Sequence, residues 1–281
     1  MKHITLAFLL ITTIAFSQTE QKAPEYGWKN SMVAGLNLTQ VSLNNWTQGG
    51  QNTIAWTFLL NGKFLYDQAD YSWTNNLKLS YGQTKLGSAD FEKSDDELFF
   101  ESIYAHNVGW KVNPYAAFML KTQMSAGYKM IEGKRTKTSD LFDPGYLMQS
   151  AGFTYTSGDV FSTRLGVAIK ESFTSNFSSY GYADDPKTVE IEKTRVQTGL
   201  ESASDLKVSL MENVQFKSSL NLFTAFQTID VWDVRWDNTI TAKVNDYVNV
   251  SINALVIHEI AQTRRTQLKE TLALGLNYTL L

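Results

Sequence analysis

The chain has 281 residues, a formal net charge of −3 at pH 7 and no cysteine. A nucleic-acid-binding protein normally carries a basic patch, so this charge argues against that class. The absence of cysteine excludes disulfides, thiolate nucleophiles and cysteine-ligated metals. Beyond the N-terminal segment no apolar run approaches the roughly 18 residues of a membrane helix, so we expect none.

Residues 1–17 have the features of a secretory signal peptide. Lys2 provides a basic start, an apolar run extends from Ile4 to Phe16, and Ser17 is a small residue at the expected cleavage point. The run is shorter than the roughly 20 residues that cross a bilayer, which disfavours a membrane anchor. We therefore expect a signal peptide at 1–17, a short periplasmic segment at 18–27 and a single domain at 28–281.

Apolar and polar residues alternate along most of the remaining chain, which is the period of a β-strand. No helical spacing is sustained after residue 18. The alternation predicts twelve strands, at about 28–40, 51–66, 72–85, 97–110, 115–130, 146–156, 160–173, 191–205, 213–226, 231–244, 247–260 and 266–281.

The expected connections alternate between short and long. Short connections at 67–70, 111–114, 157–159 and 245–246 contain Asp, Asn, Gly or Pro, as hairpin turns require. Long polar connections stand at 86–97, 131–145 and 174–190. Outer-membrane barrels show this asymmetry, with short periplasmic turns and longer external loops. An even number of strands then places both ends of the barrel domain on the periplasmic side.

A soluble β-sandwich is the alternative fold, but its strands usually have about five or six residues. The strands expected here have 11 to 16 residues, and about 9 to 11 are enough to cross a membrane when tilted. The face opposite the apolar one is rich in Thr, Ser, Asn and Gly, and aromatic residues gather near strand ends, as in interfacial girdles. We therefore predict an all-β chain with a single transmembrane antiparallel up-and-down β-barrel of about twelve strands.

The segment 232–244 illustrates the two faces of such a strand. One face is apolar apart from Asn238, whereas the other has no apolar residue. We expect the apolar face to contact lipid and the charged face to point into the lumen. Applied along the chain, this assignment gives the candidate lumen-lining residues Asp233, Arg235, Asp237, Lys243, Arg164, Lys170, Arg195 and Glu201. Opposite charges on these strands could pair and fill the interior, or could line a pore.

Two connections have unusual composition. The first holds Asn45, Trp46, Gly49 and Gly50, which predict either a loop folded into the lumen or a wide turn. The expected loop 86–97 holds the pair Asp95 and Asp96 among further acidic residues, which could bind Ca²⁺ or bridge cations to lipopolysaccharide. Its spacing matches no defined calcium loop, so we favour a solvated loop and expect no metal or other cofactor.

Histidines provide the only candidates for catalysis. Some twelve-stranded outer-membrane barrels are phospholipases, which need a nucleophile, a base and an orienting group. After signal cleavage only His106 and His258 remain, and neither stands in such an arrangement. We therefore expect that the chain is not an enzyme.

The first hundred residues resemble an uncharacterised family of outer-membrane barrels from Bacteroidota-type Gram-negative bacteria. The matching residues are Asn37, Gln40, Asn45, Trp46, Gly49, Gly50, Trp73, Asn75, Tyr81, Gly82, Asp95 and Asp96. The resemblance implies an outer-membrane location and a barrel fold, and it implies no activity.

The C-terminal segment "LGLNYTLL" resembles the terminal-strand signal that the barrel assembly machinery recognises, although Leu281 replaces the usual final aromatic residue. The expected partners are therefore this machinery, outer-membrane lipid and lipopolysaccharide, but no nucleic acid. Two functions stay open, and a third, a lipid-modifying enzyme, is disfavoured. The first is a narrow pore for solutes, and the second is a closed structural or interaction barrel whose loops bind lipopolysaccharide or an envelope partner.

Overall fold

Twelve antiparallel strands close into one barrel, which confirms the predicted fold class. The computed structural model describes residues 26–44, 50–180, 182–185, 188–260 and 265–281. The barrel strands are β1 (Gly27–Val41), β2 (Thr53–Asp67), β3 (Tyr71–Leu86), β4 (Glu92–His106), β5 (Val112–Thr122), β8 (Gly145–Ser157), β9 (Phe161–Phe173), β10 (Thr194–Met211), β11 (Val214–Ala225), β12 (Asp233–Lys243), β13 (Val248–His258) and β14 (Gln267–Thr279). Each strand pairs with its sequence neighbour, β5 pairs with β8, and β14 closes the barrel against β1. Within these residues, no helix has the length and apolar character needed to cross a membrane.

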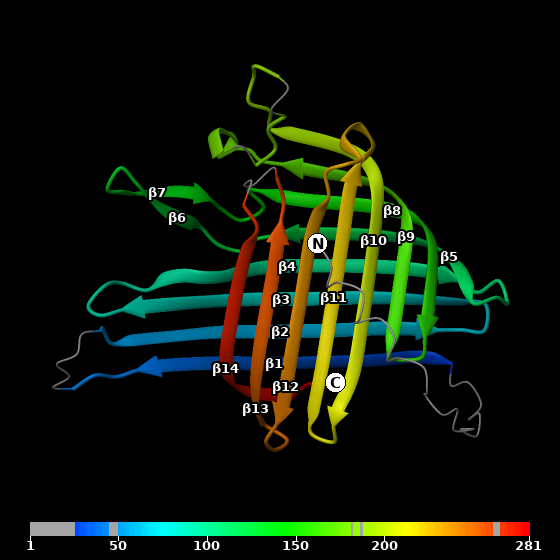
Figure 1. The fold of residues 1–281 in the computed structure, drawn as a ribbon, viewed down its shortest axis with the longest axis horizontal. Helices are drawn as coiled ribbons and strands as arrows, with labels where there is room; N and C mark the ends of the chain where they lie inside the picture. The colour runs from blue at the N-terminus through cyan, green and yellow to red at the C-terminus, as the bar shows by residue number, and fades with distance from the viewer. Residues whose placement is uncertain (1–25, 45–49, 181, 186–187, 261–264) are drawn as a thin grey trace, which may run out of the picture.

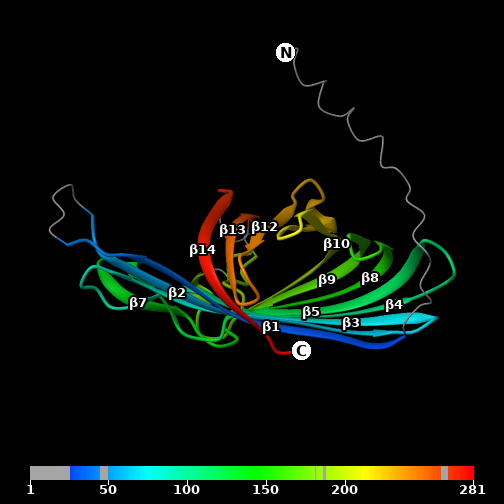
Figure 2. The same cartoon turned by 90° about the horizontal axis from the view of Figure 1, so that it is seen from below.

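The two walls of the barrel cross each other. In Figure 1, β11–β14 run nearly upright in front of β1–β4, which run nearly horizontally behind them. Figure 2 shows from below that β12–β14 stand over the layer formed by β1–β4. Strands of a closed barrel tilt against its axis, so strands on opposite walls point in different directions. Long side chains from the two walls can therefore meet in the interior.

The connections differ between the two ends of the barrel. The turn end holds the connections 68–70, 107–111, 158–160, 212–213 and 244–247, together with the start of β1 and the end of β14. The loop end holds the connections 42–52, 87–91, 123–144, 174–193, 226–232 and 259–266, with the short 3-10 turns η1 (Ser178–Tyr180) and η2 (Phe226–Thr228). The longest connections lie at the loop end, as the sequence predicts.

The expected loop at 86–97 is wrong in its second half, because β4 already begins at Glu92. Asp95 and Asp96 lie in this strand, opposite Gly82 and Tyr81 of β3. The run of acidic residues resembles a loop, but backbone pairing with β3 extends the strand through it. The expected turn at 111–114 is also displaced, since the turn is 107–111 and β5 starts at Val112.

The expected connection 131–145 contains a further hairpin. The predicted strand at 115–130 ends at Thr122, and a two-stranded sheet of β6 (Gly127–Ile131) and β7 (Lys134–Ser139) follows. The two residues between these strands, Glu132 and Gly133, have φ values of 51° and 78°. Two successive positive φ values are characteristic of a tight hairpin turn whose twist matches its strands. The hairpin projects sideways from the loop end (Figure 1).

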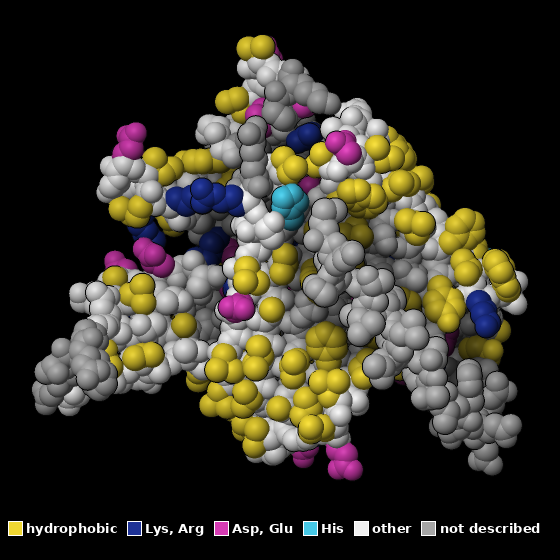
Figure 3. All heavy atoms as spheres, in the orientation of Figure 1, with side chains coloured by type: hydrophobic (Ala, Val, Ile, Leu, Met, Phe, Trp, Pro, Cys, Tyr) yellow, Lys and Arg dark blue, Asp and Glu magenta, His cyan; other side chains and the backbone are white. Residues whose placement is uncertain are grey.

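The outer face of the barrel is apolar. Figure 3 shows hydrophobic side chains covering the lower part of the wall formed by β11–β14. Ile240, Ile252 and Leu272 lie side by side in this wall, since Ile252 pairs with both of the others, and they are 40%, 55% and 65% exposed. So many exposed apolar side chains in one wall would be unfavourable in water, whereas hydrocarbon can contact them without cost.

Candidate functional site: the charged barrel interior

Ion pairs between strands that are not neighbours identify the inner face. Arg235 of β12 lies 3.0 Å from Glu97 of β4, and Lys170 of β9 lies 2.9 Å from Asp233 of β12. At least two strands separate the members of each pair around the barrel. Such pairs form only through the interior, because side chains on the outer face diverge.

A buried cluster around Arg164 occupies one side of the interior. We call Arg164, Glu101, Glu201, Tyr115 and Ser150 the Arg164 cluster. The Arg164 guanidinium binds Glu101 and lies 3.1 Å from Glu201, and Glu201 also accepts hydrogen bonds from Tyr115 at 2.8 Å and from Ser150 at 2.7 Å. Glu201 is only 2% exposed. A buried carboxylate is tolerated because a cation and several donors replace its water.

Two glycines make this cluster geometrically possible. Tyr115, Gly152, Gly166 and Glu201 form one row across β5, β8, β9 and β10 in direct register. A Cβ at Gly166 would lie 2.5 Å from the Tyr115 hydroxyl. Because the two glycines leave no side chain at this level of β8 and β9, the Tyr115 side chain extends across both strands, and its hydroxyl reaches Glu201.

A second cluster connects four strands, β3, β4, β5 and β12, near the loop end. We call Glu97, Lys78, Lys121 and Arg235 the Glu97 cluster. Lys78 and Arg235 each lie 3.0 Å from Glu97, and Lys121 lies 3.9 Å away. The side chains of Lys78 and Lys121 are 35% and 32% exposed, so water reaches this cluster. One carboxylate thus joins the wall containing β3–β5 to β12 on the opposite wall.

Lys170 forms a third set of ion pairs beside the second cluster. Its ammonium group lies 2.9 Å from Asp233 and 3.0 Å from Glu259, and it stands 5.3 Å from the ring centre of Phe223. Phe223 belongs to a small apolar core with Ala168 and Ala225. The lysine ammonium therefore lies over an aromatic ring, and two carboxylates neutralise its charge at the loop end.

Three lysines that form no ion pair with any described residue lie in the half nearer the turn end. We call Lys63, Lys207 and Lys217 the lysine cluster. All three point inward. Lys63 lies opposite Asn76 in the strand pairing, and Asn76 donates a hydrogen bond to the inward-facing Glu101. Lys207 lies on the same face of β10 as the inward-facing Glu201, and Lys217 lies opposite Lys207. All three are exposed to solvent. Most ion-paired charges of the interior thus lie towards the loop end. Towards the turn end lie these three exposed lysines, together with the Lys29–Asp67 ion pair and Asp205.

The structure brings most of the predicted lumen residues into contact with partners. Arg164 meets Glu201, Lys170 meets Asp233, Arg235 meets Glu97, and Asp237 accepts a hydrogen bond from Asn253. Two predicted residues stand apart from these clusters. Arg195 donates to the backbone carbonyl of Asp184 at 3.1 Å, and Lys243 pairs with Asp246 of a turn at 2.7 Å.

The other predicted features give a mixed result. Asn45, Trp46 and Gly49 lie outside the described residues, so the inward-folded loop stays a prediction. Gly50 has a φ of 109°, a backbone conformation that L side chains rarely adopt. Asp95 accepts from Ser80 at 2.6 Å inside the barrel, whereas Asp96 binds Lys93 and the backbone amides of Met124 and Ser125. The acidic pair is therefore bonded within the protein, which corrects the expected solvated loop.

Sequence reasoning missed several interior residues, namely Glu97, Glu101, Lys78, Lys121, Tyr115 and Glu259. A usable signal exists for the first two. From Glu97 to Tyr104, the odd positions are Glu, Phe, Glu and Ile, while the even positions are Leu, Phe, Ser and Tyr. Bulky residues on both faces hide the alternation, but the two carboxylates at positions four apart share one face of a strand.

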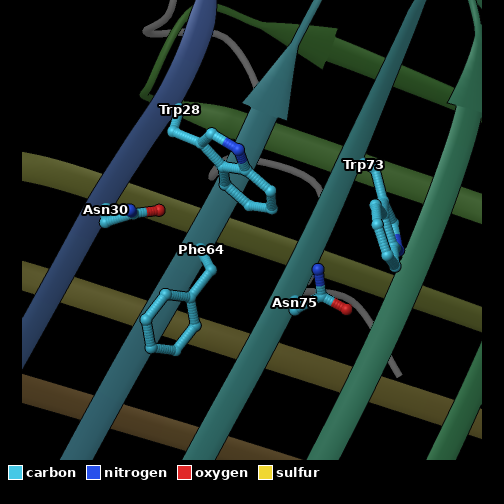
Figure 4. A pocket seen from close by; sticks show the side chains of 5 residues that line it. All are labelled: Trp28, Asn30, Phe64, Trp73 and Asn75. Atoms are coloured by element: carbon cyan, nitrogen blue, oxygen red, sulfur yellow. The ribbon is translucent and has the colours of Figure 1, made fainter.

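A groove lies on the outer face near the turn end. Trp28 and Asn30 of β1, Phe64 of β2, and Trp73 and Asn75 of β3 line it (Figure 4). The Trp73 ring nitrogen donates to Ser102 at 2.8 Å, so the polar end of the ring is satisfied. Further rings extend this aromatic cluster, since Trp28 lies 5.0 Å from Tyr66 and Tyr71 lies 5.5 Å from Tyr104. A belt of amphipathic rings at one end of the apolar wall is typical of a membrane interface.

The loop end is held together by a buried carboxylate. Asp143, between β7 and β8, accepts a hydrogen bond from the Thr174 hydroxyl and from the backbone amides of Ser175 and Asn176, at 2.9 and 2.8 Å for the amides. Burial of Asp143 opposes its ionisation, but these three donors outweigh burial and lower its pKa. Asp143 therefore joins the two longest loops.

The described residues provide no arrangement for metal chemistry. In this part of the chain, no group of three or more His, Cys, Asp or Glu side chains could hold a metal ion. His258 shares a hydrogen bond of 3.1 Å with Thr266 at the loop end. His258 therefore bonds to a residue only eight positions further along the chain.

A family model described as a protein of unknown function (DUF3078) matches residues 38–128, which supports the resemblance to an uncharacterised family. No curated protein matches the chain by sequence. Among solved structures, an outer membrane channel from Pseudomonas putida F1 is 10% identical, with 94% of this chain and 99% of that chain covered at a TM-score of 0.42. The translocator domain of the autotransporter NalP from Neisseria meningitidis is 8% identical, and the match covers 91% of this chain and 89% of that chain at a TM-score of 0.41. The CymD monoaromatic hydrocarbon channel is 9% identical, and the match covers 91% of this chain and 88% of that chain at a TM-score of 0.34. The strand pairing of this chain itself, rather than these distant likenesses, establishes the barrel.

Proposed function

We propose that the chain is an integral outer-membrane barrel that passes small solutes through a narrow, charge-lined interior. In this proposal residues 1–17 are a cleaved signal peptide, and the turn end faces the periplasm. The apolar outer face and the aromatic cluster at the turn end support a location in a bilayer. Ring closure satisfies the backbone hydrogen bonds of every strand, which a bilayer requires.

One observation carries the channel: inward-facing polar side chains are exposed to solvent on both sides of the ion-pair clusters. Lys269, which pairs with Asp95 across the interior, has a side chain that is 50% exposed towards the loop end. Asn61 and Lys63 are exposed towards the turn end. Water therefore enters the barrel from both ends, and the Glu97 cluster lies between the two wet regions as a constriction.

The test is a planar-bilayer recording of the refolded full chain. We expect small conductance steps, which increase when Arg235→Ala removes the side chain that joins β12 to Glu97. Lys111→Ala provides a control, because it removes one exposed positive charge from a turn outside the interior. Correct folding is checked by heat-modifiable gel migration, and a correctly folded protein without conductance steps would exclude the channel.

A second function is favoured by the hairpin β6–β7, namely binding of lipopolysaccharide at the loop end. Its exposed residues include Lys129, Lys134 and Arg135, and Met130 is 65% exposed. The guanidinium of Arg135 lies 4.1 Å from the ring centre of Tyr128. Cationic side chains bind phosphate, and neighbouring apolar side chains contact acyl chains.

Binding of the full chain to purified lipopolysaccharide tests this second function. Combined Lys129→Gln and Lys134→Gln substitution should weaken binding, whereas Lys111→Gln should not. Equal binding by all three proteins would contradict a role of the hairpin. A chain that binds lipopolysaccharide but conducts nothing would be a closed interaction barrel.

A further inference from the structure

Two opposite walls bring the lysine cluster together. Lys207 of β10 and Lys217 of β11 are direct cross-strand partners. Lys63 comes from β2, which lies five strands away from β11 around the shorter side of the barrel. Lys63 faces the same turn-end half of the interior from its own wall. Three ammonium groups therefore share one region of the interior.

Among the described residues, these three lysines form no ion pair. Like charges directly opposite each other on neighbouring strands are destabilising. Asp205 shares the inward face of β10 two residues before Lys207, but it lies opposite Ser219 and makes no ion pair with these lysines. By contrast, Arg164, Lys170 and Arg235 each contact a carboxylate.

The three lysines remain accessible to solutes. All of them are exposed, and so are Asn61 and Asn221, which share their inward faces. Each lysine stands in the half of its strand nearer the turn end. Ammonium groups donate strong hydrogen bonds to anionic oxygens, and amide groups add neutral donors. A small anion entering from the turn end meets these groups before the ion-pair clusters.

We propose that Lys63, Lys207 and Lys217 form a binding site for small phosphate-bearing anions, which makes the barrel interior anion-selective. Three cations suit a phosphate group, which carries up to two negative charges and several acceptor oxygens, better than a singly charged carboxylate. The selectivity rests on the proposed channel function, whereas the binding site itself does not. In a narrow interior with low-dielectric walls, such a cluster concentrates anions, and added salt weakens the effect.

The experiment measures reversal potential and phosphate block in planar bilayers under a KCl gradient. Wild-type protein should prefer chloride to potassium, and inorganic phosphate should reduce the chloride current more than acetate does. In Lys217→Gln, the phosphate concentration needed for half block should rise about tenfold, since a charged hydrogen-bond donor is lost. Lys217→Arg keeps the charge and should retain anion preference. Lys111→Gln is the matched control and should behave like wild type.

A second readout separates this site from the channel. Phosphate should raise the temperature at which the folded gel band of the wild-type chain disappears, and this rise should be smaller in Lys217→Gln. If the wild-type chain conducts nothing but gains this protection, the channel fails and the site stands. If it conducts with no anion preference and phosphate gives neither block nor protection, the site fails and the channel stands. Should Lys217→Gln fail to fold, Lys63→Gln replaces it in both measurements, and a response equal to wild type would overturn the proposal.

Discussion

The Arg164 cluster and the lysine cluster lie inside one barrel but differ in ion pairing and in exposure to solvent. Arg164 is paired with two carboxylates, and its side chain is 10% exposed. Lys63, Lys207 and Lys217 have no ion pair among the described residues and are exposed to solvent. The two clusters share walls, since Glu201 and Lys207 both belong to β10.

Access to water explains this difference. A charge removed from water loses several kcal/mol of solvation and needs a partner and hydrogen bonds to replace it. A charge that keeps its water does not need a partner, and it remains available to a solute. On the filled side each charge therefore depends on its partners, whereas the wet side near the turn end is the part suited to ligand binding.

The largest expected effect breaks the buried cluster. Arg164→Met leaves Glu101 and Glu201 buried without a cation, which should lower the free energy of unfolding by about 3–5 kcal/mol. Urea unfolding of the barrel in detergent micelles or lipid measures this loss. Adding Glu101→Gln and Glu201→Gln to Arg164→Met should recover much of the stability. A loss below about 1 kcal/mol, as found for exposed ion pairs, would show that water enters the cluster.

A charge introduced on the outer face would have neither an ion-pair partner nor water. It therefore adds a third environment to the comparison of the two clusters. Ile252→Arg on the outer face of β13 should cost about 2–4 kcal/mol in a bilayer if the position lies near its midplane. Thr271→Arg is the matched control, because Thr271 lies on the inward, exposed face of the adjacent strand. Folding yield and urea unfolding in lipid vesicles measure both variants. Equal stabilities would argue against lipid contact at this wall.

Asp143 tests whether a buried charge can be stabilised by hydrogen bonds alone. Asp143→Ala should destabilise the loop end by about 1.5–3 kcal/mol and speed hydrogen exchange of the Ser175 and Asn176 amides. Because donors lower the pKa of Asp143, its contribution is present above the ordinary carboxyl pKa of about 3.9 and is lost as the pH falls through the lower folded value. The variant should lack this acid-dependent loss. Unchanged exchange at both amides would contradict the link between the loops.

The smallest effect is expected in the lysine cluster. Lys217→Gln removes repulsion with Lys207 and breaks no ion pair, so the free energy of unfolding should stay equal or rise by at most about 0.5 kcal/mol. The same urea series measures it beside Arg164→Met. A loss comparable to that of Arg164→Met would mean that Lys217 has a structural role, and it would remove the contrast between the two clusters.

Alternation of residue types predicted the strand number and the barrel, because successive side chains of a strand point to opposite faces of the sheet. It also predicted that Asp233 and Arg235 share a face, and both make cross-barrel contacts. The β4 region was predicted poorly. Phe99 and Phe100 place bulk on both faces, and Asp95 and Asp96 resemble a loop although pairing with β3 holds them in a strand. The hairpin β6–β7 was missed, although Glu132 and Gly133 stand between its two short strands as a turn pair.

Where the two faces differ clearly, as in β12, local patterning specified which side chains point inward, since it depends only on neighbours along one strand. In β4 it did not, because both faces are bulky. The partners of those side chains depend on closure and shear, which bring β4 close to β9 and β12 and place Lys63 and Lys217 on different walls of one interior. These residues are separated by dozens of positions, and the alternation contains no information on register between distant strands. Only the assembled barrel therefore decided which charges are neutralised and which are left for a solute.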